Sequence, residues 1–549
     1  MQIQVRINEE GALRNQRYAF TDRFTLVSEL LQNARRAGAT RVEIHYDAAT
    51  KVLQVHDDGC GLDDFQKLLS LHESGWDAAT NAEEHPFGVG FSKVLYACTR
   101  CIVASGHQRV DIDTAAALAK VSFEVAQTTE TDAVSGTRIE LHGVDLPELG
   151  LRIETLCLGF PVAVLFNGQA LARRFAQANL AMLPSPIGMV YLAGASDGQH
   201  SRDTMVFLQG FCVLKPTWCA HDRVNVVHLD SRQFMARLPD RDKLIDEDVQ
   251  RKRIDAELKA CWRATLETTK HRLTPERFVD TFYATMRAWG HLDLMNDLDV
   301  LPAELCDTIV GYPIQDDSGQ REYVQPVATA PTRAAIKSGA VTLVALDRVN
   351  DDNAARWMLA RAKGYLVFEW IGLHPDHWAR RQVRFLEDES VAIEVVSETA
   401  RTTLEGRWVW PDVILCDAVR VRVGDDGTEI IDAGVCHAGN VYIPAGESSG
   451  EPVRQLSSFT DAHDQFLGSD RDADREALAD LIGHLRAVDP VQTLDSLLRE
   501  LRLGKYPLLH GKTFQLTVGV GSVPGHSVEL VEQAEHAVSA YAGGPDAKP

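Results

Sequence analysis

The first quarter of the chain alternates segments that have the hydrophobic spacing of helices with segments that have that of strands. Across residues 21–37, apolar side chains recur every three or four positions and Gly38 follows, which predicts an amphipathic helix that stops there. RVEIHY (41–46) and KVLQVH (51–56) alternate apolar and polar side chains around a turn at 47–50. This pattern predicts a pair of strands.

The same alternation continues to about residue 142. A helix is predicted from about Ser92, and CIVAS (101–105) and RVDID (109–113) predict two strands. Further strands are expected near 119–125 and 137–142. We therefore expect one layer of helices on a mostly antiparallel sheet.

Later segments predict more mixed structure. PVAVLF (161–166) and TMVFLQG (204–210) are strand-like, and the charged stretch from about 240 to 272 predicts a long helix. Residues 341–370 predict one strand–helix–strand unit, with VTLVAL and YLVFEW as its strands. The expected division is 1–145, a second α/β domain at 146–273, a mixed region at 274–445, a polar linker at 446–473, a small α/β piece at 474–541 and a disordered tail at 542–549.

The composition argues against nucleic-acid-binding, disulfide-rich, secreted and membrane-spanning classes of protein. The 549 residues carry 56 Lys plus Arg against 78 Asp plus Glu, a net charge of −22, which argues against a broad basic surface for nucleic acid. Ten cysteines are too few for a disulfide framework and suit the cytoplasm. The start has no secretory pattern and no apolar run reaches the ~20 residues of a membrane span, so no membrane association is expected.

Four short motifs hold residues suited to nucleotide chemistry. In ELLQNARRAGA (29–39), Glu29 and Asn33 share one helical face, where a carboxylate can accept a proton and an amide oxygen can ligate Mg²⁺. In HDDGCGL (56–62), Asp57 ends a strand, and Gly59 and Gly61 permit close approach of a ligand. Each motif alone is more often a solvated helix face or an ordinary turn.

The other two motifs complete the series. In HPFGVGFSKVL (85–95), Gly88 and Gly90 precede a helix, so backbone N–H groups are free to bind phosphate. In SGTRIEL (135–141), Gly136 and Thr137 open a strand. No GxxxxGK[ST] is present, which excludes a P-loop.

The order and spacing of these four motifs resemble the GHKL ATPase superfamily of DNA gyrase, HtpG-type chaperones, histidine kinases and MutL. The resemblance spans about residues 20–142; ELLQNARRAGATRVEI is most similar to MutL, and FGVGFSKVLYA (87–97) to the HtpG chaperones. It implies an N-terminal two-layer α/β sandwich of the GHKL (Bergerat) type followed by further α+β domains. It also implies ATP and Mg²⁺ as ligands.

The resemblance assigns roles to individual positions. Glu29 would be the general base, and Asn33 would hold Mg²⁺. Asp57 would accept the adenine amino group, with Thr137 supporting it. The remaining nucleotide contacts would be Gly59 and Gly61 at the base, and Gly88, Val89, Gly90 and Phe91 at the phosphates through backbone N–H groups. Residues 72–86 would form a lid, and Lys93 would either add positive charge near the phosphates or lie exposed.

Arg36 departs from the family pattern, which has an acidic residue at this position. Arg36 lies on the face of Glu29 and would either pair with it, making a poorer base, or reach the nucleotide phosphates. Either hypothesis leaves the rate of turnover open. Arg241 in LPDRDKLID (238–246), with Lys243 as second choice, is loosely similar to a catalytic arginine of chaperone middle domains, although the segment also suits a plain helix start.

The remaining clusters are interpreted as structural. Cys98 and Cys101 lack a second pair for zinc, and His374 and His377 lack partners at ligand spacing. The functional hypothesis is a slow Mg²⁺-dependent ATPase acting as a chaperone-like clamp on a protein partner, dimeric when ATP binds. A DNA-processing ATPase of the MutL or gyrase kind, and an ATP-binding switch with little hydrolysis, stay open as alternatives. The charge makes a nucleic-acid partner the less favoured one.

Overall fold

The structure is a computed structural model of the 549-residue chain. It describes residues 3–4, 8–16, 23–70, 75–77, 80, 84, 90–216, 223–237, 242–314, 321–456, 468–519 and 525–531. The chain divides into two compact units. Unit 1 comprises Met1–Cys306, Val327–Val341 and Glu369–Gln382, and unit 2 comprises Asp307–Pro326, Thr342–Phe368 and Val383–Pro549.

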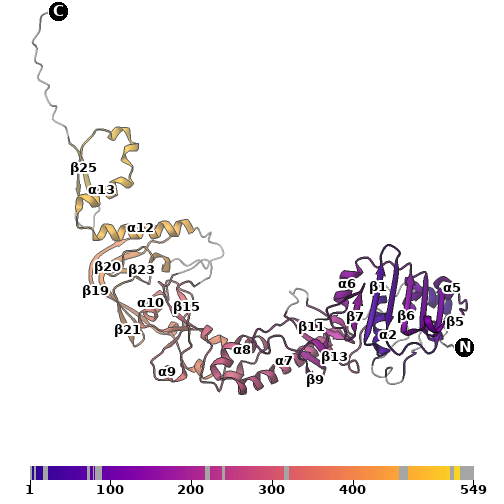
Figure 1. The fold of residues 1–549 in the computed structure, drawn as a ribbon. Coiled ribbons are helices and arrows are strands. Elements are labelled where there is room, and N and C mark those ends of the chain that lie inside the picture. Colours follow the sequence, from indigo (N-terminus) through magenta and orange to yellow (C-terminus); the bar gives the residue numbers. More distant parts are fainter. Residues whose placement is uncertain are drawn as a thin grey trace, which may run out of the picture. The chain divides into compact units, whose positions relative to one another are not determined.

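Unit 1 begins with an eight-stranded sheet in the order β5-β4-β3-β6-β2-β1-β7-β8 (Figure 1). Its strands are β1 (Arg41–Asp47), β2 (Val52–Asp57), β3 (Arg100–Gly106), β4 (Gln108–Asp113), β5 (Val125–Gln127), β6 (Val134–His142), β7 (Ala163–Phe166) and β8 (Gln169–Ala170). All neighbours pair antiparallel except β1 and β7, which are parallel. The expected mostly antiparallel sheet is confirmed.

Helices pack on this sheet through one hydrophobic core. They are α2 (Thr25–Arg36), η1 (Phe65–Leu68), α4 (Ser92–Ala97), α5 (Thr114–Leu118) and α6 (Leu149–Leu156), and the chain also forms α1 (Glu9–Gln16) and η2 (Glu130–Asp132) in this region. Val27 and Leu31 of α2 are fully buried with Ile44 of β1 and Leu53 of β2, as the helical spacing of the apolar residues predicts. Gly38 follows α2 in a left-handed conformation that ends the helix.

Two predictions about this region differ from the structure. The sheet continues past residue 145, because β7 joins the edge of β1 as a parallel strand. The strand expected near 119–125 is mostly absent: α5 follows β4 and only the short β5 remains. Asp113 starts α5, since its side chain accepts the N–H of Ala116 at 2.8 Å, and Lys120 after the helix has a left-handed conformation, with φ at +62°, that an extended strand does not have.

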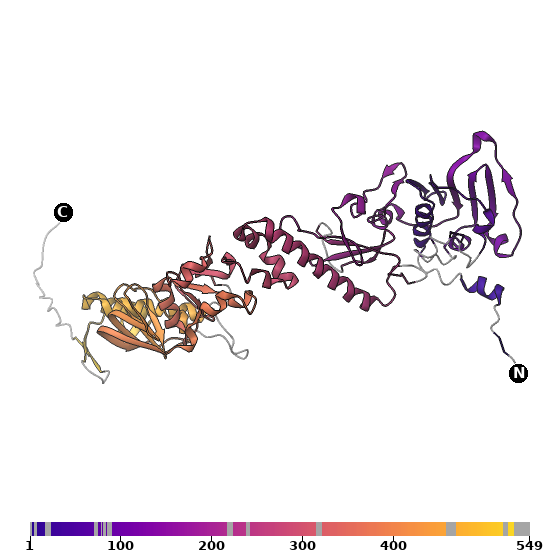
Figure 2. The same cartoon turned by 90° about the horizontal axis from the view of Figure 1, so that it is seen from below.

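A second sheet in unit 1 has the order β12-β11-β13-β10-β9. Its strands are β9 (Leu183–Ser185), β10 (Gly188–Tyr191), β11 (Thr204–Leu208), β12 (Phe211–Leu214) and β13 (Asn225–Leu229), preceded by η3 (Gln177–Asn179). Two helices follow as neighbours, α7 (Glu247–Arg272) and α8 (Pro275–Trp289) (Figure 2). Trp262 and Trp289 stack between them with ring centroids 6.0 Å apart. The long helix thus begins at Glu247, seven residues later than expected.

Short elements complete unit 1: η4 (Leu292–Met295), η5 (Ala303–Leu305), α9 (Arg333–Lys337), η6 (Trp370–Gly372) and η7 (Trp378–Gln382). In unit 2, β16 (Leu343–Ala345), α10 (Ala354–Lys363) and β17 (Leu366–Phe368) form the predicted strand–helix–strand unit with parallel strands. Three more strands extend that sheet, β14 (Cys306–Ile309), β15 (Val324–Pro326) and β18 (Val383–Phe385).

The other large sheet of unit 2 has the order β19-β20-β23-β22, with β21 paired to β20. Its strands are β19 (Val391–Thr403), β20 (Asp412–Val423), β21 (Asp426–Ile430), β22 (Val435–His437) and β23 (Asn440–Ile443). Next come α11 (Val453–Leu456) and α12 (Gly468–Arg486). The polar linker expected at 446–473 is thus partly packed structure, in which Glu447 and Val453 are buried.

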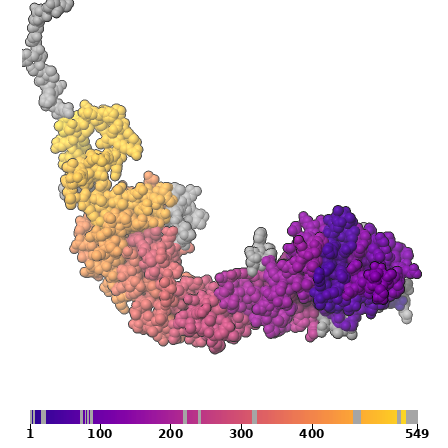
Figure 3. All heavy atoms as spheres, in the orientation of Figure 1, coloured from indigo at the N-terminus to yellow at the C-terminus, as the bar shows by residue number. Residues whose placement is uncertain are grey.

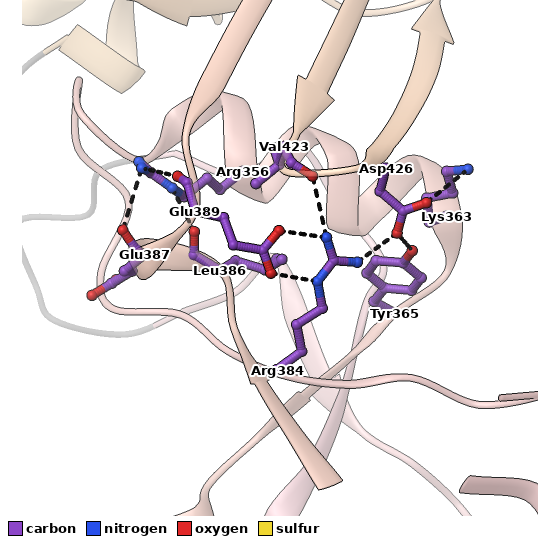
Figure 4. A network of polar contacts seen from close by, with 9 residues as sticks. All are labelled: Arg356, Lys363, Tyr365, Arg384, Leu386, Glu387, Glu389, Val423 and Asp426. Carbon is purple, nitrogen blue, oxygen red and sulfur yellow. Dashed lines mark hydrogen bonds and ion pairs between the residues drawn. The ribbon is translucent and has the colours of Figure 1, made fainter. Parts of the chain in front are cut away.

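A polar network ties the two sheets of unit 2 together (Figure 4). Arg384 binds Glu389 through two nitrogens at 2.6 Å each, and it also contacts Asp426 at 2.5 Å. Asp426 accepts a further bond from Tyr365, which together with burial raises the pKa of Tyr365 to about 12. Arg384, Glu389, Asp426 and Tyr365 therefore each have an oppositely charged or hydrogen-bonding partner. A polar network satisfied in this way stabilises the contact between the two sheets.

Candidate functional site

Asp57 lies at the end of β2, opposite Thr137 of β6 in the strand register. Its side chain is buried, with 6% of the residue exposed, and its Oδ1 accepts the N–H of Gly59 at 3.0 Å. Burial raises the pKa of Asp57, and the bond from Gly59 and the charge of His56 oppose this only in part. A buried carboxylate of this kind is suited to a ligand that donates hydrogen bonds.

Glycines near Asp57 allow neighbouring backbone segments to approach one another closely. A Cβ atom at Gly136, where φ is +74°, would lie 2.0 Å from the carbonyl oxygen of Asp57. At Gly61, with φ at +78°, it would lie 2.7 Å from the Oγ of Ser105. The glycines of the second and fourth motifs are therefore required to bring β2 and β6 this close.

Ser105 of β3 joins the two glycine motifs, and sequence analysis missed it. Its hydroxyl donates to the carbonyl of Gly136 at 2.7 Å and accepts the N–H of Leu62 at 2.8 Å. The side chain is buried and pairs in register with Thr137. A serine inside a strand gives no sequence pattern that would single it out.

Glu29 of α2 approaches the glycine bend ahead of α4. The residue is 5% exposed, and a Cβ atom at Gly90 would lie 2.4 Å from its Oε2. The Nζ of Lys93 lies 3.5 Å from its Oε1. Lys93 is itself only 4% exposed, so it is not the exposed lysine that was one of the two interpretations. Phe91 caps the start of α4 directly after this bend.

Helix α2 and the residue after it contact both the residues around Gly59 and the residues around Gly90. Its Glu29 lies against Gly90, while beyond its end a Cβ atom at Gly59 would lie 2.7 Å from the Cβ of Ala37. Asn33 is one turn after Glu29 and lies between Glu29 and Ala37 in the sequence. Its side chain is half-buried. The first, second and third motifs thus meet on α2, although 20 to 60 residues separate them in sequence.

Several predicted residues fall outside the described part of the chain. They are Gly88 and Val89 of the glycine motif, Arg241 of the second domain, and residues 72–74, 78–79, 81–83 and 85–86 of the lid. Lys243, the second choice after Arg241, is exposed, and its carbonyl accepts the N–H of Arg237 at 2.7 Å.

Arg36 has a partner that neither sequence hypothesis considered. Its Nε donates to the Oε2 of Glu84 at 2.9 Å, and Arg35 donates to the same oxygen at 2.5 Å. The Arg36 side chain is 3% exposed. Burial alone would raise the pKa of Glu84, but the two guanidinium groups outweigh it and the pKa is lowered. Arg36, which departs from the family pattern, therefore binds a residue of the expected lid together with its neighbour Arg35.

Gln209 brings the second sheet of unit 1 to the same place. It lies in the turn between β11 and β12, with φ at +55°, a strained conformation for a residue other than glycine. Its amide oxygen accepts a hydrogen bond from Gln32 of α2, and its amide nitrogen donates to the carbonyl of Glu84 at 3.3 Å. Gln209 was not predicted because its contacts join segments that are more than 100 residues apart in the sequence.

The cysteine and histidine clusters interpreted as structural are buried or half-buried. Cys98 and Cys101 are buried in the core, and burial raises the pKa of Cys98 to about 12. Burial lowers the pKa of His377 to about 4. Among the described residues, no group of three or more His, Cys, Asp or Glu side chains is arranged to hold a metal ion. The described helices also include none with the length and apolar character that crossing a bilayer requires.

A comparison with known protein families matches the region that holds the four motifs. The family model "Histidine kinase-, DNA gyrase B-, and HSP90-like ATPase" matches residues 22–142, the segment that carries all four motifs. A comparison with curated proteins gives no match. The family match and the mixed sheet with its helices support assignment of residues 22–142, a part of this chain, to the GHKL ATPase superfamily, with further α+β domains after it.

Proposed function

We propose that this chain binds Mg²⁺-ATP between α2 and the glycine bend before α4, hydrolyses it slowly, and acts as a nucleotide-gated, chaperone-like clamp on a protein partner. The observation that carries the proposal is the contact of α2 with both groups: Gly59, which bonds to buried Asp57, and Gly90 beside Glu29. The family match at residues 22–142 supports ATP binding and ATPase activity in general.

The purine binds at the Asp57 end. The Asp57 carboxylate accepts the amino group of adenine, and the glycines Gly59, Gly61 and Gly136 let the surrounding backbone pack closely around that carboxylate. A guanine would present a carbonyl oxygen at this place, so two acceptors would face each other. Adenine is therefore the preferred base, with Thr137 beside Asp57 supporting the same end.

The triphosphate binds at the Gly90 end. Backbone N–H groups of Gly88, Val89, Gly90 and Phe91 donate to its oxygens, and Lys93 supplies a positive charge. A Cβ atom at Gly90 would clash with Glu29, so the bend approaches Glu29 this closely only because it lacks a side chain. Asn33 offers an amide oxygen to Mg²⁺, which neutralises phosphate charge when bound.

Glu29 accepts a proton from the attacking water. In this structure its Oε1 faces Lys93 at 3.5 Å, and both side chains are buried. Lys93 must turn toward the phosphates before the carboxylate is available to water. This exchange of partners is a physical reason for slow turnover, and it is independent of Arg36.

Gln209 makes the clamp responsive to nucleotide. Its two hydrogen bonds connect Gln32 of α2 and Glu84 with the turn between β11 and β12. A shift of α2 or of Glu84 on binding must therefore break or move these bonds. Arg241 of the following segment is proposed to reach the γ-phosphate in the closed state, in which two copies meet.

Replacing Asp57 tests the purine end. Asp57→Asn keeps the size but removes the negative charge, and hydrogen bonds to charged groups contribute roughly 1.5–3 kcal/mol, so ADP affinity should fall about 10- to 100-fold in calorimetry. Because the pKa of Asp57 is raised, wild-type affinity should also decline with falling pH earlier than for an ordinary carboxylate. The exposed neighbour Asp58→Asn is the control; equal affinity of both variants would remove Asp57 from the site.

Replacing Glu29 tests the chemical step. Glu29→Gln should bind ATP with little change and slow hydrolysis by ~10²–10⁴-fold, the usual effect of removing a general base. Glu43→Gln, on β1 of the same domain, is the control. Steady-state phosphate release and nucleotide binding are measured together. Equal hydrolysis by wild type and Glu29→Gln would rule out this mechanism.

Replacing Gln209 tests the connection to the second sheet. Hydrogen exchange of wild type with a non-hydrolysable ATP analogue should change in residues 25–142 and also in β11 and β13. In Gln209→Ala, the change should be confined to the first domain, because the bridging amide is gone. The exposed Gln199→Ala should behave as wild type. If hydrogen exchange of β11 changed in Gln209→Ala as much as in wild type, Gln209 would not be the connection between the nucleotide and the second sheet.

A DNA-processing ATPase is the second candidate, because ELLQNARRAGATRVEI is similar to MutL. The net charge of −22 favours a protein partner instead. We expect the ATPase rate to stay the same when duplex DNA is added at low salt, where electrostatic binding is strongest. Stimulation by DNA would favour the second candidate over the clamp.

A further inference from the structure

The purine end of the candidate site is a row of three side chains on three neighbouring strands. In the sheet domain, whose atoms are indigo and purple in Figure 3, β6 lies between β2 and β3. Thr137 of β6 is opposite Asp57 of β2 on one side and opposite Ser105 of β3 on the other. Residues directly opposite each other share a face, which here is the face that the helices cover. Ser105 therefore extends the pair of residues assigned to the base.

The backbone of β6 is irregular directly before this row. The register between β3 and β6 shifts here, so that Ser135 and Gly136 have no opposite residue in β3. A bulge of this kind leaves backbone groups without their ladder partners. Gly136 has φ at +74°, and a Cβ atom there would lie 2.0 Å from the carbonyl oxygen of Asp57. The position of Gly136 therefore sets how Thr137, the next residue, lies beside Asp57.

The hydroxyl of Ser105 connects this bulge to the loop that follows β2. It donates to the carbonyl of Gly136 at 2.7 Å and accepts the N–H of Leu62 at 2.8 Å. A hydroxyl suits this position because one oxygen both donates and accepts. Ser105 is 4% exposed, and a Cβ atom at Gly61 would lie 2.7 Å from its Oγ. Both bonds go to protein atoms, so Ser105 acts on a ligand through its neighbours.

The two bonds of Ser105 act on both sides of Asp57. On the β6 side, the Gly136 carbonyl is held directly before Thr137. On the loop side, Leu62 ends the segment whose Gly59 donates to the Oδ1 of Asp57 at 3.0 Å. A shift of the loop would turn the carboxylate, and a shift of the bulge would move the threonine hydroxyl. Such supporting hydrogen bonds decide whether binding groups keep their geometry.

We propose that Ser105 is a positioning residue for purine recognition, which aligns Asp57 and Thr137 with the 6-amino group of adenine. The inference rests on the proposed binding of adenine at Asp57. It separates the two ends of the site, because both bonds of Ser105 end at the purine side, whereas Glu29 and Gly90 contact each other through α2 and the bend before α4. Loss of the hydroxyl thus weakens recognition of the base and leaves the phosphate end intact.

A purely structural role of Ser105 predicts a different result, since a destabilised domain would bind every nucleotide less tightly. Two ligands distinguish the roles: ADP, and purine riboside 5′-diphosphate, which has the same ribose and phosphates but lacks the 6-amino group. The ratio of their two dissociation constants measures recognition of the amino group alone. A change of this ratio in a variant measures the coupling between the substituted side chain and that group.

Three variants of the full chain are compared with wild type. Ser105→Ala removes the hydroxyl, and Ser105→Cys keeps a side chain of similar size with much weaker hydrogen bonds. Ser135→Ala is the matched control, because Ser135 is an exposed serine of the same bulge. Calorimetry gives the dissociation constants of both ligands, and thermal unfolding without ligand shows whether each variant is folded.

Wild type and Ser135→Ala should bind ADP at least about 10-fold more tightly than the analogue, the usual effect of a hydrogen bond to a charged group. In Ser105→Ala and Ser105→Cys, the dissociation constant of ADP should rise about 10-fold while that of the analogue changes less than about 2-fold. The ratio should therefore fall toward one in both variants.

An equal rise of both dissociation constants would show a structural role and overturn the proposal. Binding of ADP by Ser105→Ala as tight as in wild type would overturn it as well. If wild type bound neither ligand, or bound both equally, the proposed adenine site itself would be wrong, and the role of Ser105 with it. The result for wild type thus distinguishes a failure of the proposed function from a failure of this inference.

Discussion

The candidate site depends on one amphipathic helix, α2. Its apolar side, with Val27 and Leu31, is fixed in the core against the sheet, so its other contacts cannot shift independently. Glu29 is thereby held against Gly90, and Ala37 against Gly59. The distance between Gly59 and Gly90, the two ends of the candidate site, is set by this helix, and this separation supports the proposal of an extended ligand such as a nucleoside triphosphate.

The same helix carries the feature that separates this chain from the family pattern. Arg35 and Arg36 share the carboxylate of Glu84, and Gln32 meets Gln209 from the second sheet. A short acidic residue at position 36 would repel Glu84 instead of binding it. Burial of these charges and amides leaves them few alternative partners. Hydrogen bonds around Glu84 and Gln209 therefore connect α2, a residue of the expected lid and the second sheet of unit 1.

Local pattern was sufficient for most of the N-terminal fold, and the roles assigned to the residues of the four motifs stay predictions. The period of apolar residues placed α2, β1 and β2, and the strand–helix–strand unit at 341–370 was equally clear. Contacts between distant segments were not predictable in this way. Ser105 is one strand residue among several, and Gln209 matters only because a turn meets α2. The parallel addition of β7 likewise depends on a free strand edge, which a linear sequence does not show.

The most direct test is a crystal structure of the full chain with Mg²⁺ and a non-hydrolysable ATP analogue. The account predicts the adenine amino group within hydrogen-bond distance of the Asp57 carboxylate, and the triphosphate at Gly90 with Lys93 turned from Glu29 toward it. A nucleotide bound away from α2, or one bound there with its purine remote from Asp57, would contradict the account.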